Sequence, residues 1–371
     1  MPGFLEFFCG GGMVRAGLGP AWRCLLANDL DPKKCAAYAE NFGDDRLIAG
    51  DIAALSAEEV PGGADLAWAS FPCQDLSLAG ARAGLAGGRS ATYWAFHRLI
   101  AELRARDAAP RIIALENVCG LLTSRGGRDF GALTDSLDDL GYRVGALTID
   151  AAAFLPQSRP RLFVIAMDEG IAPPASAPQA DMPMLETAWA AASARARDRR
   201  VYWPRPQPAR PRSDLVDLID PRADAWRSQE ETARLLGRMT AMHRSRVEAA
   251  RADGGAHAFT VFNRMRPDGR GGSVQRAEAR FDGLAGCLRT PAGGSSRQTL
   301  LWVAEGRARS RLLSPREAAR LMGLPDGYRL PERPNDAYRL LGDGVAVPVI
   351  RRLAETIFEP ALAGRRIAAA A

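Results

Sequence analysis

The first half of the chain alternates short apolar runs with longer stretches of helical periodicity, as far as about residue 167. That alternation predicts an α/β fold, a doubly wound and mostly parallel sheet with helices on both faces. The predicted strands are Phe4–Phe8, Arg23–Ala27, Leu47–Ala49, Asp65–Ser70, Arg111–Leu115, Tyr142–Thr148 and Arg161–Met167. The predicted helices between them are Pro32–Phe42, Tyr93–Arg106 and Phe130–Leu140.

The pattern changes after this region. Residues 170–183 are rich in proline and alanine, and residues 199–214 combine arginine with proline, as linkers and irregular loops do. From about residue 186 to 300 the alternation is lost, and helical periodicity returns at Ser314–Met322 and Val345–Phe358. We therefore expect a first domain over 1–185, a smaller domain over 186–329, and a C-terminal segment over 330–371 that returns to the first domain.

Composition narrows the class of protein. The chain has 371 residues, 47% of them hydrophobic, as in a globular protein. Its net charge is +6, and Lys33 and Lys34 are the only lysines, so arginine carries nearly all the positive charge. Arginine suits phosphate and guanine recognition, although GC-rich coding DNA produces the same bias.

Several other classes are disfavoured. No apolar run approaches the ~18 residues of a membrane span, and Phe4–Phe8 has the pattern of a core strand rather than a signal peptide. Six scattered cysteines without a CxxC pair, and three histidines without a cluster, indicate neither a metal site nor a disulfide framework. We expect a reduced, cytoplasmic protein that needs no metal and binds no membrane.

Three of the predicted strands end in residues that suit a nucleotide-like ligand. Phe8-Cys9-Gly10-Gly11-Gly12 follows the first strand, and glycines there let a ligand approach the backbone. Asp29 and Asp51 follow the next two strands. Carboxyl ends of adjacent parallel strands line one crevice, where acids suit ribose hydroxyls or an amino group. Either acid alone is more typical of a helix N-cap.

The fourth and fifth strands end in a thiol and a carboxyl group. Phe71-Pro72-Cys73-Gln74 follows one, and Glu116-Asn117-Val118 ends the other. A lone cysteine is more often buried packing, but a thiol beside an acid suits nucleophilic addition to a protonatable ring. The long glycine-bearing segment from Cys73 to about Thr92 is typical of a functional loop.

These motifs, in this order, resemble the DNA (cytosine-5) methyltransferase family over nearly the whole chain. Gln157-Ser158-Arg159-Pro160-Arg161 resembles the family's Gln-x-Arg-x-Arg motif. Arg311 to Asp326 resembles its ninth motif, and Gly342-Asp343-Gly344-Val345 stands where Gly-Asn-x-Val is usual. The family has the Rossmann-like fold of S-adenosylmethionine-dependent methyltransferases and acts on double-stranded DNA.

The resemblance implies roles for individual residues. Cys73 is the implied nucleophile toward carbon 6 of a flipped cytosine, Glu116 binds its ring nitrogen 3 and amine, and Arg159 and Arg161 hold its carbonyl oxygen. The cofactor residues it implies are Phe8, Gly10, Gly12, Asp29, Asp51, Ile52, Pro72, Asp343 and Val345. The DNA contacts it implies are Gln74, Ser77, Arg89, Arg289, Thr290 and Arg297. It further implies a monomer in the bacterial nucleoid, with a possible cognate restriction enzyme.

Three departures from the family pattern remove no catalytic group: Met13, Asp75 and Asp343. An RNA-acting member of the family remains an alternative, but the Cys-Phe-Thr motif of that branch is absent from the sequence. A non-catalytic DNA-binding regulator would be expected to lose Cys73 or Glu116, and a nicotinamide enzyme would need hydride chemistry in their place. Target recognition is expected within about 186–310, where arginines lie in predicted loops: Arg264, Arg266, Arg270, Arg276, Arg280, Arg289 and Arg297.

Overall fold

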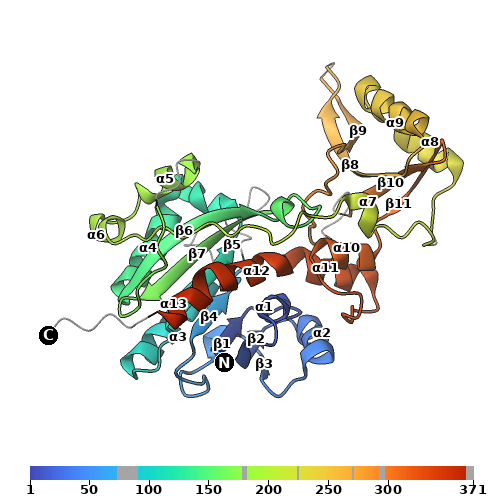
Figure 1. Cartoon of the computed structure of the whole chain (residues 1–371). Coiled ribbons are helices and arrows are strands. Elements are labelled where there is room, and N and C mark those ends of the chain that lie inside the picture. Colours follow the sequence, from blue (N-terminus) through green and yellow to red (C-terminus); the bar gives the residue numbers. More distant parts are fainter. Residues whose placement is uncertain (73–90, 178–181, 224, 270, 292–296, 365–371) are drawn as a thin grey trace. The chain divides into compact units, whose positions relative to one another are not determined.

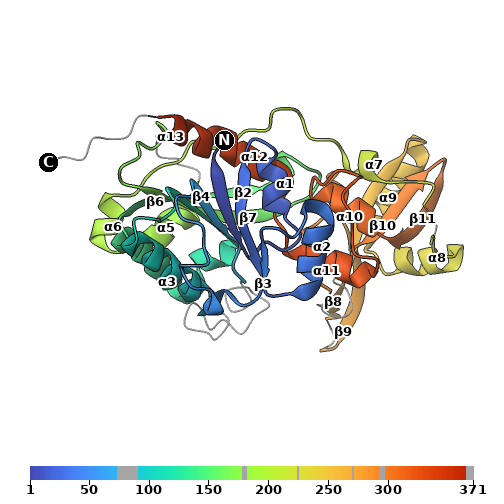
Figure 2. The same cartoon turned by 90° about the horizontal axis from the view of Figure 1, so that it is seen from below.

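The computed structural model describes residues 1–72, 91–177, 182–223, 225–269, 271–291 and 297–364 (Figures 1 and 2). The chain forms two compact units. The first contains Met1–Asp150, Pro160–Gln207 and the chain from Val347 onward, and the second contains Ala151–Arg159 and Pro208–Ala346.

A single sheet forms the centre of the first unit. Its strands are β1 (Gly3–Phe7), β2 (Arg23–Asp29), β3 (Leu47–Ala49), β4 (Leu66–Ala69), β5 (Ile112–Asn117), β6 (Tyr142–Asp150) and β7 (Pro160–Asp168). Their order is β3-β2-β1-β4-β5-β7-β6, and the pairs from β3 to β5 are all parallel (Figure 1). The predicted doubly wound, mostly parallel sheet is therefore confirmed, with each predicted strand present within a few residues.

β7 runs against this direction. It pairs antiparallel with β5 on one side and with β6 on the other. The segment between β6 and β7, Ala151–Arg159, is shorter than the crossover of about a dozen residues that a parallel connection needs. A hairpin is the remaining solution, and it brings the first residues of β7 to the sheet edge where β1, β4 and β5 end.

The helices of the first unit follow from local capping and close packing. Asp31 caps the helix that begins at Pro32, its side chain accepting from the Lys33 amide at 2.9 Å. Gly17 lets two helices touch, because a Cβ there would lie 2.5 Å from the Cβ of Ile350. The helices are α1 (Met13–Leu18), α2 (Pro32–Phe42), α3 (Ala91–Ala105), α4 (Arg128–Asp139), α5 (Pro183–Trp189), α6 (Ala194–Asp198), α12 (Val347–Leu353) and α13 (Glu359–Ala363).

The second unit confirms the predicted helical stretch Ser314–Met322 as α10 (Pro315–Leu321), but its other regular elements were not predicted from the sequence. Its strands are β8 (His257–Pro267), β9 (Ser273–Ala279), β10 (Thr299–Ala304) and β11 (Arg307–Leu312), in the antiparallel order β11-β10-β8-β9. Its helices are α7 (Leu215–Leu218), α8 (Gln229–Gly237), α9 (Ala241–Asp253), α10 (Pro315–Leu321) and α11 (Pro334–Asp343).

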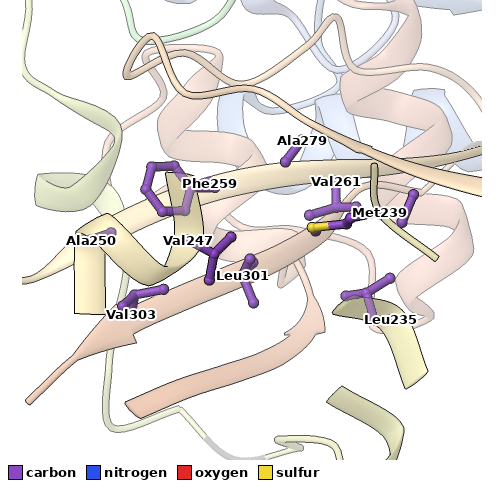
Figure 3. Close-up of a cluster of buried hydrophobic side chains, with 10 residues drawn as sticks. Leu235, Met239, Val247, Ala250, Phe259, Val261, Ala279, Leu301 and Val303 are labelled. Carbon is purple, nitrogen blue, oxygen red and sulfur yellow. The ribbon is translucent and has the colours of Figure 1, made fainter. Parts of the chain in front are cut away.

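Helices α8 and α9 share a core with one face of this sheet (Figure 3). Leu235 and Val247 come from the helices, and Phe259, Val261 and Leu301 come from the strands. Each is at most 8% exposed, so the cluster excludes water. The unit therefore has a hydrophobic core of its own.

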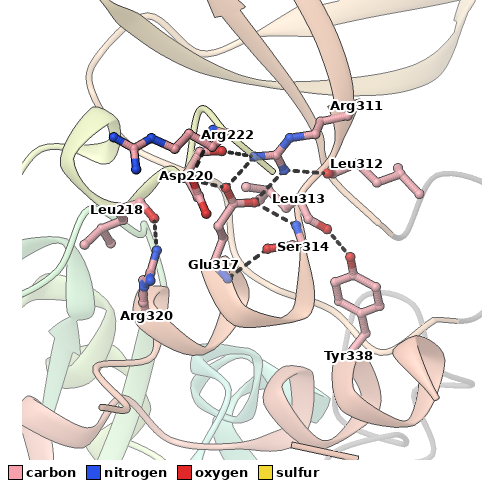
Figure 4. A network of polar contacts seen from close by, with 10 residues as sticks. All are labelled: Leu218, Asp220, Arg222, Arg311, Leu312, Leu313, Ser314, Glu317, Arg320 and Tyr338. Carbon is pink, nitrogen blue, oxygen red and sulfur yellow. Dashed lines mark hydrogen bonds and ion pairs between the residues drawn. The ribbon is translucent and has the colours of Figure 1, made fainter. Parts of the chain in front are cut away.

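A buried ion pair fixes the start of α10 (Figure 4). Both guanidinium Nη atoms of Arg311 bind Glu317, at 2.7 and 2.6 Å, and both side chains are about 98% shielded from water. Ser314 and Glu317 also form a capping box at the helix N-terminus. Burial acts to raise the pKa of Glu317, but the Arg311 guanidinium and the amides of Ser314 and Asp220 outweigh it and lower that pKa.

The compact units divide the chain at other positions than the predicted domains. Residues 186–207 belong to the first unit, and residues 330–346 belong to the second. Ala151–Arg159 also joins the second unit, because Gln157 and Arg159 form their buried hydrogen bonds there. Among the described residues, none of the helices combines the length and the apolar character that crossing a bilayer requires.

Candidate active site

The glycine turn after β1 has an unusual backbone conformation. Phe8, Gly10 and Gly12 have φ values of 57°, 54° and 75°, in the left-handed region. For Phe8 this is strained, and such strain is typical of functional sites. A Cβ at Gly10 would meet nothing within 4 Å, so a ligand has room to approach the backbone there. At Gly12 a Cβ would lie 2.5 Å from the Phe42 ring, so only glycine fits.

Asp29 holds this turn in place. One carboxylate oxygen accepts from the Gly10 amide at 2.8 Å, and the other accepts from the Asp31 amide at 2.9 Å. Asn28 ties the end of β2 to the end of β3, donating to Ile48 and Gly50 carbonyls at 2.9 Å. The carboxyl ends of the first three strands thus form one hydrogen-bonded edge.

Asp51 and Ile52 complete that edge. Asp51 is exposed and one of its oxygens caps a short 3₁₀ turn by accepting from the Ala53 amide at 2.9 Å, while Ile52 is buried. The capping role considered from the sequence is therefore real for Asp51. Its second role, toward the cofactor, stays a prediction.

At the end of β5, Glu116 forms an ion pair with Arg161. The Arg161 Nε lies 3.0 Å from Glu116 Oε1, and the side chains are only 15% and 8% exposed. The antiparallel direction of β7 makes this contact possible, because it sets Leu162 opposite Asn117 and Arg161 just beyond the strand end. A charge pair with little solvent around it suits the binding of a polar heterocycle.

Asn117 connects the same strand end to the residues before Cys73. Its side-chain amide donates to the Phe71 carbonyl at 3.2 Å, and its oxygen accepts from the Val118 amide at 2.9 Å. Pro72 is exposed next to Phe71. Of the predicted site residues, four lie outside the described residues: Cys73, Gln74, Ser77 and Arg89.

Arg159 belongs to the second unit and is 2% exposed. Its guanidinium donates to the carbonyls of Leu288 at 3.0 Å, Gly342 at 2.8 Å and Gly344 at 2.6 Å. These bonds join the predicted Gln-x-Arg-x-Arg motif to the last motif. They give Arg159 a structural task, whereas its contact with the base stays a prediction.

The remaining predicted residues also lie in the second unit. Asp343 ends α11 and is exposed, and Val345 is buried. Arg289 and Arg297 are exposed, and Thr290 is half-buried. Their contacts with cofactor or DNA stay predictions.

Gly342 is required by packing in this region. A Cβ there would lie 2.6 Å from the Arg289 carbonyl carbon and 2.7 Å from the Thr290 nitrogen, both backbone atoms. We expect Gly342→Ala to lower the free energy of unfolding by ~1–3 kcal/mol through overpacking. Urea unfolding measures this, with Gly327→Ala as the control, since a Cβ there meets nothing within 4 Å. Equal effects of the two variants would contradict the packing role.

Two notable residues of the first unit were not predicted from the sequence. Leu30 follows Asp29 and is 67% exposed, an apolar side chain in water beside the cofactor candidates. Glu6 lies inside β1 and is fully buried, and burial raises its pKa to about 8 against the opposing Arg15 charge. An acid in an otherwise apolar strand was the signal available in the sequence.

Comparison with known proteins shows which family this chain belongs to. Residues 3–359 match the family described as C-5 cytosine-specific DNA methylase. The chain belongs to this family.

Relatives of the C-5 cytosine-specific DNA methylase family match along most of the chain. The type II methyltransferase M.DsaV of Dactylococcopsis salina is 26% identical, over 95% of this chain and 84% of that protein. M.HhaI of Haemophilus parahaemolyticus, also a type II methyltransferase, is 24% identical over 95% of this chain and 93% of that protein. The crystal structure of S. pombe Dnmt2 methyltransferase has the same fold, with a TM-score of 0.60 and 17% identity over 97% of this chain and 99% of that one.

Membership makes the chain a DNA cytosine-5 methyltransferase, which implies S-adenosylmethionine as methyl donor. The first unit fits that cofactor. Open space lies over the Gly10 backbone, while Asp29 and Asp51 supply carboxylates and Phe8 and Leu30 supply apolar surface at the same edge. This combination matches a ligand with hydroxyls, an amino group and an aromatic base.

Proposed function

We propose that this enzyme methylates carbon 5 of a cytosine flipped out of duplex DNA, through a covalent bond between Cys73 and carbon 6. The observation that carries the proposal is the Glu116–Arg161 pair at 3.0 Å, at the end of β5. Asn117, the next residue, binds the Phe71 carbonyl two positions before Cys73. The acid and the cation thus lie at one sheet edge, and the described chain that leads to Cys73 is hydrogen-bonded to the same edge at Phe71.

Each side chain has a defined task in the reaction. The Cys73 thiolate bonds to carbon 6, and the electron pair of the carbon 5–carbon 6 double bond moves into the ring. Nitrogen 3 takes up a proton through Glu116, whose carboxylate then pairs with the protonated nitrogen and with the exocyclic amine, so the adduct is a neutral enamine. Arg161 binds the ring carbonyl oxygen and orients Glu116. After methylation, water takes the carbon 5 proton, and the electron pair of that bond restores the double bond and expels Cys73 as thiolate, while nitrogen 3 returns its proton to Glu116.

The cofactor supplies the electrophilic methyl group when it is bound. Asp29 would hold its ribose hydroxyls, Asp51 its adenine amino group, and the glycine turn its methionine part. Because neither ring carbon is reachable within a base pair, the cytosine must leave the duplex, at a cost of a few kcal/mol. Contacts between the enzyme and the DNA would offset that cost.

The proposal is tested with duplex DNA that carries 5-fluorocytosine at the target position. Fluorine cannot leave as a cation, so the enzyme with cofactor should form an adduct that survives denaturant and is visible by mass. We expect no adduct with Cys73→Ala, and an unchanged yield with Cys119→Ala, a half-buried cysteine close to Glu116 in sequence. An adduct that formed only with RNA would overturn the assignment to DNA.

The second unit is proposed to recognise the target sequence. It has its own core and carries the exposed Arg289 and Arg297. The names of the relatives place them in type II systems, and we propose the same setting for this enzyme. Bisulfite sequencing of DNA from a methylation-free host that expresses it identifies the target.

A further inference from the structure

The β8–β9 hairpin extends beyond the core of the second unit. The first half of β8 is buried, but Arg264, Met265, Arg266 and Pro267 are exposed. Strand pairing nevertheless continues to the pair Pro267–Ser273. We define the outer ribbon as residues 264–267 and 273–276.

Two hydrogen bonds between Asp268 and Gly272 close the end of the outer ribbon. The Asp268 amide donates to the Gly272 carbonyl at 3.0 Å, and the Gly272 amide donates to the Asp268 carboxylate at 2.9 Å. The ribbon is therefore a defined two-stranded element rather than a loop.

Its two faces differ in chemistry. Alternation and register place Arg264, Arg266 and Arg276 on one face, together with Glu278 at its base. On the other face Met265 lies opposite Gln275, and Pro267 opposite Ser273. One face is thus strongly cationic, and the other is uncharged.

Glu278 organises the cationic face. It binds Arg266 through two bonds, Nε to Oε1 at 2.5 Å and Nη2 to Oε2 at 2.8 Å, and lies 3.6 Å from the Arg264 Nε. The hydrogen bond from Arg266 lowers the pKa of Glu278, so the carboxylate stays ionised. Arg264 also lies over the Phe262 ring, 5.6 Å from its centroid. One anion therefore orients two guanidinium groups.

Arg264 lies directly opposite Arg276 across the ribbon. Like charges in facing positions destabilise a strand pair, so the free hairpin gains nothing from this arrangement. When a polyanion is bound, the two facing positive charges are stabilising instead. A two-stranded ribbon has the width that the DNA major groove admits, and arginine bound bidentately to guanine O6 and N7 is the commonest specific contact there.

The carboxylate of Glu278 favours recognition of bases over binding to phosphates alone. Phosphates would repel Glu278, and a purely phosphate-binding surface has no use for an anion at its centre. An anion that pre-orients guanidinium groups, in contrast, improves directional contacts with bases.

We propose that Arg264 and Arg276 are specificity-determining residues that read guanine in the major groove, with Glu278 as the positioning residue for Arg264. The proposal rests on the proposed function, since the DNA is the substrate of methyl transfer. The outer ribbon would bind in the major groove of duplex DNA.

The test compares Arg264→Ala, Arg276→Ala and the double variant with Gln275→Ala and Met265→Ala, which alter the uncharged face of the same ribbon. Methylation of a library with a randomised site, read by bisulfite sequencing, gives the preference at every position. Each arginine variant should lose about tenfold or more of the preference for guanine at one position. The two controls should stay within twofold of wild type.

Glu278→Gln provides a second, opposite readout. It should weaken the guanine preference that Arg264 supplies and leave that of Arg276, while raising the affinity for non-specific DNA because a negative charge is lost. A uniform fall in methylation with unchanged preferences in the arginine variants would mean phosphate contact and would overturn the proposal, as would no change at all. If wild-type enzyme formed no adduct with fluorinated DNA, the proposed function itself would fail, so the two failures are distinguishable.

Discussion

Glu116→Gln is expected to reduce kcat by ~10²–10⁴-fold, the usual contribution of a positioned acid or base. The amide has nearly the same shape, but it cannot carry the charge that pairs with Arg161 at 3.0 Å. It also cannot stabilise a protonated nitrogen 3. Single-turnover methyl transfer to duplex DNA measures the loss, and calorimetry should find cofactor affinity within a few-fold of wild type.

A control separates catalysis from general charge effects. Glu102→Gln removes a glutamate that also forms an ion pair, with Arg98 at 2.6 Å, but on the exposed surface of α3. We expect its kcat to match wild type. If Glu116→Gln retained more than about a third of the wild-type kcat, Glu116 would have no direct part in the chemistry.

Glu6→Gln is expected to stabilise the enzyme at alkaline pH. Glu6 is fully buried inside β1. Burial raises its pKa from 4.5 to about 8, aided by Asp29 and opposed by the Arg15 charge and the amides of Val14 and Arg15. In the folded protein Glu6 therefore keeps its proton at neutral pH, whereas the unfolded chain loses it above about pH 4.5.

The sign of the pH dependence follows from linkage. Between these two pKa values the folded state binds one more proton, so the free energy of unfolding falls by ~1.4 kcal/mol per pH unit. The stability from the neutral carboxyl is complete below the unfolded pKa and is lost as pH rises through the folded pKa. The full loss is of order 3–5 kcal/mol by pH 8, and glutamine, which has no proton to lose, should abolish it.

Urea unfolding at pH 5, 7 and 9 measures this difference. The curves for wild type and Glu6→Gln should diverge as pH rises, while Glu58→Gln, whose carboxylate is 82% exposed, should follow wild type. The neighbours that also titrate, Cys9 and Tyr38, have pKa values that burial raises, and both remain in every variant. Parallel curves for wild type and Glu6→Gln would show that the Glu6 carboxyl is ionised in the folded enzyme.

The sequence predicted the first unit well because its central strands β1, β4 and β5 are buried on both faces. Continuous apolar runs such as Ile112 to Leu115 mark such strands locally, and the residues that follow them fall on one sheet edge. The direction of β7 is not a local property. It depends on the short connection Ala151–Arg159, and it determines that Arg161 contacts Glu116.

The second unit was harder to predict for a physical reason. In β9 the residues that face the core are Ala277 and Ala279, whose small side chains give little hydrophobic signal. The exposed half of β8 carries arginines, which on their own are typical of loops. Burial by α8 and α9 organises these strands, and it depends on contacts between residues distant in the chain.

The way Gln157 and Arg159 are bound within the second unit has a consequence for how new sequence specificities arise. Arg159 and Gln157 anchor the second unit through the carbonyls of Leu288, Leu321, Gly342 and Gly344. All of these acceptors are main-chain atoms, present whatever side chains surround them. Mutation and recombination can therefore change the side chains of this unit without breaking the hydrogen bonds of Gln157 and Arg159, provided that the backbone conformation is kept. A grafted unit should accordingly include residues 151–159, because a contiguous transplant would separate the two anchoring side chains from the backbone they evolved with.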